Sequence, residues 1–154
     1  MQNLVLVCAI KKKTKIRQSL QRFRDSLWQW SQHPNLGTTI VVTENLNSRT
    51  EQVIAIVRAH QNSWGHMCHP LLERRPRENP DDLWCAMRSV MSVIELESLR
   101  QYETVVFILD SELLVTLFRE LTNLSVGQHQ VLESCEAVII DKTNSTRFTE
   151  YRIP

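Results

Sequence analysis

Two kinds of apolar pattern alternate along this chain. Continuous runs of apolar and β-branched residues occupy positions 4–10 and 104–109, and a third β-branched run covers 38–43. Such runs are typical of interior strands in a parallel sheet, because both faces of those strands are covered by other elements. The pattern therefore predicts three buried, parallel strands.

Between these runs, apolar residues recur at helical spacing, in segments 16–30, 48–61, 80–94 and 113–121. This spacing predicts amphipathic helices with one apolar face on the sheet. Helix starts are marked as well. Ser48 begins a Ser-x-x-Glu capping box, Asn79 precedes a proline and two acids, and Asp110 or Ser111 can cap the helix that follows 104–109.

The end of the chain has a different pattern. Two β-rich segments, 136–141 and 147–153, flank a polar turn and predict an antiparallel hairpin. Segment 64–70 could form one more short strand. Together these elements predict an α/β fold, a three-layer α/β/α domain with a mostly parallel central sheet and a C-terminal hairpin, formed by residues 1–154 as a single domain.

Composition narrows the possible partners. The 18 basic and 17 acidic residues nearly balance, so there is no overall attraction to nucleic acid or to a membrane surface. No apolar run is long enough to span a bilayer, and the first lysines follow the apolar stretch, opposite to a secretory signal. We expect a cytoplasmic protein without a cofactor. Four cysteines without paired spacing predict reduced, mostly buried thiols: Cys8, Cys68, Cys85 and Cys135.

Residues that could bind a ligand follow the ends of two predicted strands. In open α/β sheets, ligands tend to bind at the carboxyl ends of the strands. The first strand is followed by Lys11 and Lys12, and the strand 104–109 by Asp110 and Ser111. The lysines and the free amides of a helix start could hold a phosphate-like anion. The alternative is a solvated basic loop, because the Asp110 carboxylate would oppose an anion.

The order of elements and several junctions resemble the histidine phosphatase superfamily, which is phosphoglycerate mutase-like, and in particular its small phosphohistidine phosphatase branch. In that family the first strand leads into Arg-His, and a later strand ends in a second histidine. At these positions this chain has Cys8, Ala9 and Asp110. A second phosphate-binding arginine of the family falls on Arg49 if one residue is inserted, and on Asn47 otherwise.

The resemblance implies an intact fold with altered catalytic positions. An alanine cannot attack phosphorus, a thiol cannot replace a bidentate guanidinium, and a carboxylate repels phosphate. The chain would then be a pseudophosphatase, with no catalytic residues. It would act by binding an unknown protein partner or an anionic ligand, with four candidate ligand-binding residues: Lys11, Lys12, Arg49 and Ser111.

Two other interpretations remain open. An enzyme with relocated chemistry could use Asp110 and Glu73 as acid or base, with a metal at His66, Cys68 and His69. These three residues lack the regular spacing of a zinc site, so a short strand or turn with a histidine facing solvent is the simpler interpretation. A nucleic-acid binder would use the lysines at 11–13, but we do not expect one, because few aromatic residues lie near them.

Overall fold

The computed structural model describes residues 3–9, 17–18, 21, 24–25, 37–43, 51–52, 54–55, 64–72, 78–122, 137–142 and 148–152. The strands are β1 (Asn3–Cys8), β2 (Thr39–Thr43), β3 (Gly65–Cys68), β4 (Thr104–Leu109), β5 (Ala137–Lys142) and β6 (Phe148–Arg152). The helices are α3 (Pro80–Ile94), α4 (Glu97–Arg100), α5 (Ser111–Thr122) and the short 3-10 turn η1 (Pro70–Leu72).

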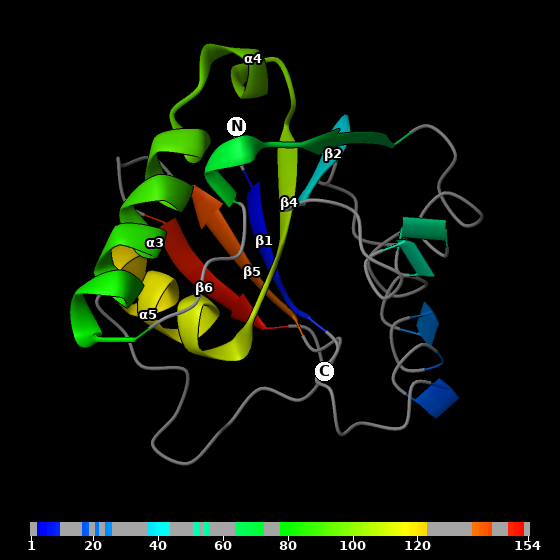
Figure 1. The fold of residues 1–154 in the computed structure, drawn as a ribbon. Coiled ribbons are helices and arrows are strands. Elements are labelled where there is room, and N and C mark those ends of the chain that lie inside the picture. Colours follow the sequence, from blue (N-terminus) through cyan, green and yellow to red (C-terminus); the bar gives the residue numbers. More distant parts are fainter. Residues whose placement is uncertain are drawn as a thin grey trace.

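The six strands form one sheet in the order β3-β2-β4-β1-β5-β6 (Figure 1). Strands β1 to β4 are mutually parallel. On the β1 side, β5 pairs antiparallel with β1, and β6 pairs antiparallel with β5. The carboxyl ends of four strands therefore lie at one end of the sheet. The predicted mostly parallel sheet, the C-terminal hairpin and the short strand within 64–70 are all confirmed.

Strands β1 and β4 are the centre of the sheet, and every residue of both is buried. Their register pairs Val5 with Val106 and ends with Cys8 opposite Leu109. The predicted strand 4–10 is thus too long. The ladder stops at Cys8 because β4 supplies no further partner, and apolar composition alone does not mark that limit.

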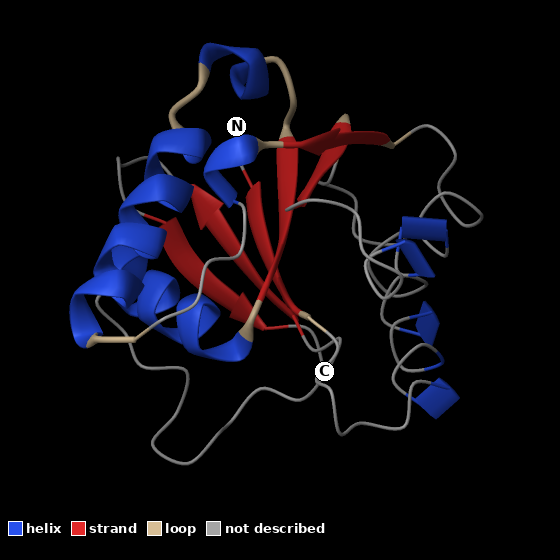
Figure 2. Cartoon of the chain, viewed as in Figure 1, coloured by secondary structure: helices blue, strands red, loops and turns tan. Residues whose placement is uncertain are grey.

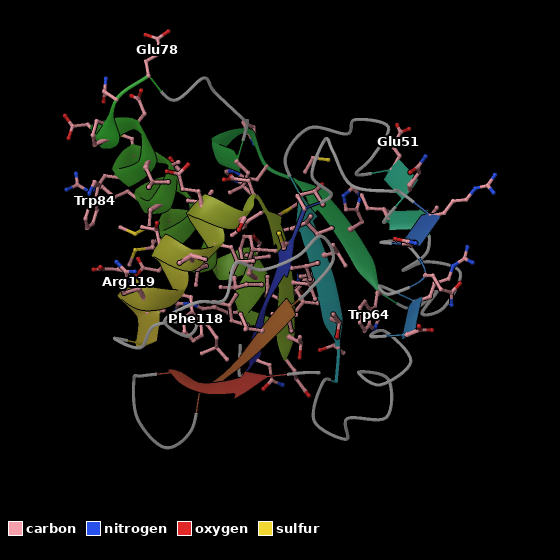
Figure 3. All side chains as sticks on the ribbon, turned by 90° about the horizontal axis from the view of Figure 1, so that it is seen from below. Glu51, Trp64, Glu78, Trp84, Phe118 and Arg119 are labelled. Atoms are coloured by element: carbon pink, nitrogen blue, oxygen red, sulfur yellow. The ribbon has the colours of Figure 1, made fainter. Side chains whose placement is uncertain are left out.

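Helices α3 and α5 cover one face of the sheet (Figure 2). Both begin at the end where the parallel strands finish, whereas α4 lies at the opposite end (Figure 1). The apolar stripe of α5 packs into the core with four buried side chains: Leu113, Leu114, Leu117 and Phe118. Figure 3 shows Trp84 of α3 pointing away from the sheet, and this side chain is 48% exposed.

The described helical residues at 17–25 and 51–55 lie on the other side of the sheet, which completes the three layers (Figure 1). Most of the predicted helices 16–30 and 48–61, including the cap at Ser48, fall outside the described residues. Helix α3 starts as expected, with Asn79 as its cap and Pro80 at its first position. Within the described ranges, no helix has the length and apolar character needed to cross a membrane.

Candidate functional site

The carboxyl ends of β1 and β4 lie side by side. The backbone amide of Ala9 donates a hydrogen bond of 2.8 Å to the carbonyl of Leu109, one step beyond the last pair of the ladder. Ala9 and Asp110 therefore follow directly on paired residues of neighbouring strands. The two positions that the resemblance assigns to the family's histidines are adjacent at this end of the sheet, and they carry a methyl group and a carboxylate.

Asp110 begins helix α5. Its backbone carbonyl accepts a hydrogen bond of 2.9 Å from the amide of Leu114, and its carboxylate Oδ2 accepts one of 3.2 Å from the amide of Leu113. This is the geometry of an N-cap residue. The carboxylate is half-buried and lies at the positive end of the helix dipole, the position that would otherwise attract an external anion.

Cys8 is buried in the core. Its side chain is 1% exposed and belongs to the hydrophobic core, and its Sγ lies 3.6 Å from the carbonyl oxygen of Ala9. The position that the resemblance assigns to a phosphate-binding arginine is therefore occupied by a small core side chain.

The proposed ligand-binding residues are only partly described. Ser111 is the first residue of α5 and is half-buried. Lys11, Lys12 and Arg49 lie outside the described residues, as do Lys13, Asn47 and Glu73. A basic contact with an anion, and the use of Glu73 as an acid or base, therefore stay predictions.

A second cluster lies two strands away, at the ends of β2 and β3. The hydroxyl Oγ1 of Thr43 is 2.9 Å from Nε2 of His66 and 3.6 Å from Sγ of Cys68, and that sulfur is 3.9 Å from the same Nε2. His69 takes part through its backbone, since its amide donates to the carbonyl of Thr43 at 3.2 Å. Over the described ranges, no group of three or more His, Cys, Asp or Glu side chains is placed to hold a metal ion.

This cluster differs from the sequence interpretation in two ways. Thr43 was not among the candidate residues, although its position as the last residue of a β-branched run marks the end of a strand. The prediction of mostly buried thiols is wrong for the described cysteines, because Cys68 and Cys85 are exposed and only Cys8 is buried. Cys68 ends an outer strand, and Cys85 lies on the solvent face of α3.

Comparison with known proteins identifies the class of fold. No family model and no curated protein sequence matches the chain. Solved structures do match over nearly the whole length. The SixA protein of Agrobacterium tumefaciens, assigned as a phosphohistidine phosphatase, has a TM-score of 0.69 at 8% identity and covers 97% of this chain and 96% of its own.

Two further structures agree. A phosphoglycerate mutase from Bacillus anthracis has a TM-score of 0.68 at 9% identity, covering 99% of this chain and 92% of its own. A mycobacterial glucosyl-3-phosphoglycerate phosphatase, solved with VO3, has a TM-score of 0.64 at 10% identity, covering 99% and 98%. The chain has the histidine phosphatase fold, as its sequence predicted. Because the sequence identity is low, the likeness is limited to the fold.

Proposed function

We propose that this chain is a non-catalytic protein of the histidine phosphatase fold that acts by binding. The observation that carries the proposal is the hydrogen bond from the amide of Ala9 to the carbonyl of Leu109, which holds Ala9 next to the residue that precedes Asp110 at the ends of β1 and β4. The methyl group of Ala9 cannot attack phosphorus, so the histidine nucleophile that the resemblance implies at this position is absent, and loss of a nucleophile removes nearly all turnover.

The described residues favour a protein partner over a phosphate-like anion. The fold can hold an oxyanion, since the similar mycobacterial phosphatase was solved with VO3. Here, however, Asp110 caps α5 with its own carboxylate, so a negative charge of the protein already lies at the helix start. A phosphate would meet repulsion there unless the lysines at 11–13 and Arg49 outweighed it.

A phosphate-release assay tests the absence of catalysis. The substrates are a generic phosphoester and a phosphohistidine peptide, and the proteins are the wild type, Ala9→Gly and Asp110→Asn. We expect no release above the level of a protein-free control in any of them. Turnover by the wild type that either substitution abolishes would overturn the proposal, because it would place the altered position in a working active site.

Affinity capture tests the partner. The bait is the full chain, compared with Ser111→Arg at the end of the sheet where β1 and β4 finish, and with Glu97→Arg in α4 at the opposite end. We expect a captured protein that Ser111→Arg loses and Glu97→Arg retains, with thermal unfolding showing that both variants are folded. If the captured protein is lost only with Glu97→Arg, the binding surface lies at the α4 end of the molecule and not near Asp110.

A further inference from the structure

The side chains of Thr43, His66 and Cys68 converge because of the parallel pairing of β2 and β3. That register sets Thr43 opposite Cys68, and His66 lies two residues before Cys68 on the same face of β3. Thr43 is fully buried, His66 is half-buried and Cys68 is exposed. A hydroxyl held by the core, an imidazole and a solvent-accessible thiol thus meet at one end of the sheet.

The distances suit proton transfer from the thiol. When the neutral imidazole of His66 carries its proton on Nδ1, Nε2 is an acceptor. The Thr43 hydroxyl can then donate to Nε2 across 2.9 Å and accept from the Cys68 thiol across 3.6 Å. The direct separation of Sγ and Nε2 is 3.9 Å, which is within the looser range of a nucleophile and base without bound substrate.

We propose that Cys68 is a site of reversible thiol–disulfide exchange with low-molecular-weight disulfides, with His66 as the proton acceptor and Thr43 as a positioning residue. The proposal does not depend on the proposed function, because it uses side chains of β2 and β3 alone. The proposed role of these side chains needs no metal ion.

The exchange step balances without a further oxidant. The proton of the Cys68 thiol passes to Nε2 of His66, directly or through the Thr43 hydroxyl. The thiolate sulfur attacks one sulfur of the small disulfide, a new S–S bond forms and the old one breaks. The departing thiolate takes up the proton from His66. One thiol and one disulfide give one mixed disulfide and one thiol.

The mixed disulfide would form near the paired ends of β1 and β4. Two inter-strand spacings of about 4.8 Å separate β3 from β4, which places Cys68 about 10 Å from the end of β4. A bound glutathione, with its carboxylates, would add bulk and negative charge at the same end of the sheet as Asp110.

Peptide-resolved mass spectrometry of the reduced, full-length chain in glutathione disulfide measures the reaction at each cysteine separately. Cys85 is the internal reference, because it is also exposed but lies on a helix whose sequence has no histidine. We expect Cys68 to be modified about tenfold faster than Cys85, the gain that a charge-assisted hydrogen bond to the thiolate provides. Equal rates at the two thiols would overturn the proposal without any variant.

Four variants assign the roles. His66→Gln should reduce the Cys68 rate to that of Cys85, whereas His69→Gln, the matched loss of a neighbouring imidazole, should leave it unchanged. Thr43→Val should slow the reaction and Thr43→Ser should restore it, since serine keeps the hydroxyl. An unchanged rate in His66→Gln refutes the proton acceptor, and an unchanged rate in Thr43→Val refutes the positioning role. Modification of the buried Cys8 reports any variant that unfolds.

Discussion

The amide of Ala9 donates a 2.8 Å hydrogen bond to the carbonyl of Leu109, and this bond joins the ends of two central strands. It is continuous with the ladder that pairs Cys8 with Leu109. The end of β1 is therefore fixed against the residue that precedes Asp110. Substitutions at Ala9 and Asp110 will act on a shared local environment, so their effects should not be assumed to add.

The carboxylate of Asp110 should stabilise helix α5. Removing it in Asp110→Ala leaves the amide of Leu113 without its acceptor, and we expect the free energy of unfolding to fall by about 1 kcal/mol. Asp110→Asn should lose less, because an amide oxygen still accepts. Urea unfolding measures both. Glu120→Ala, an exposed substitution near the end of the same helix, is the control, and an Asp110→Ala midpoint equal to that of the control would contradict the capping role.

The same carboxylate should weaken phosphate binding. A unit charge about 4 Å from a bound anion contributes about 1 kcal/mol in a water-like dielectric. We therefore expect Asp110→Asn to bind inorganic phosphate about fivefold more tightly than the wild type, with equilibrium dialysis at low ionic strength as the measurement. Equal or weaker binding by the variant would show that the charge of Asp110 does not govern anion access.

The start of helix α3 should depend on a reciprocal pair. The amide of Asp82 donates to Oδ1 of Asn79 at 3.3 Å, while Oδ2 of Asp82 accepts from the amides of Asn79 at 3.1 Å and Glu78 at 2.8 Å. Asn79→Ala and Asp82→Ala should each lower the free energy of unfolding by about 1 kcal/mol.

The two substitutions at this capping box should also be coupled. We expect the double variant to lose less than the sum, by about 0.5 kcal/mol or more. Asp81→Ala, which removes an exposed acid from the same turn, is the matched control. It should change the free energy of unfolding by less than Asn79→Ala or Asp82→Ala does. Strict additivity in urea unfolding would mean that the reciprocal bonds do not form as a unit.

Gly37 should be hard to replace because of its backbone conformation. Its φ is +57°, and a Cβ there would clash with the side chain of Glu103. The carboxylate of Glu103 is exposed and can move aside, so backbone strain of about 1–2 kcal/mol should dominate the effect of Gly37→Ala. Thermal unfolding should therefore show little rescue when Glu103→Ala is added. Full rescue would identify the clash as the main cause.

The sequence predicted the centre of the fold well for a clear physical reason. Residues 104–109 are all apolar or β-branched and are followed at once by a capping residue, so both limits of β4 were marked by the chain itself. Helix α4 had no such signal, because four residues are too few to show a helical period. The end of β1 was misplaced because it depends on the length of β4.

The candidate site was only partly predictable. That Ala9 and Asp110 would lie together followed from the expectation that neighbouring parallel strands end at the same edge. The cluster at β2 and β3 did not follow, because Thr43 and His66 are 23 residues apart in sequence and their contact depends on strand register. Sequence spacing suggested His66, Cys68 and His69 as a group, whereas His69 follows the end of β3 and the three described side chains are not placed to hold a metal ion.

The position of β1 has a consequence for synthesis of the protein. This strand pairs on one side with β4, where Asn3 faces Thr104, and on the other with β5, where Asn3 faces Asp141. Most of the polypeptide must therefore be synthesised before β1 can pair with β4 or β5. Until then the backbone amides and carbonyls of six largely apolar residues are without strand partners, so nascent chains should need a chaperone most during the interval before β4 emerges.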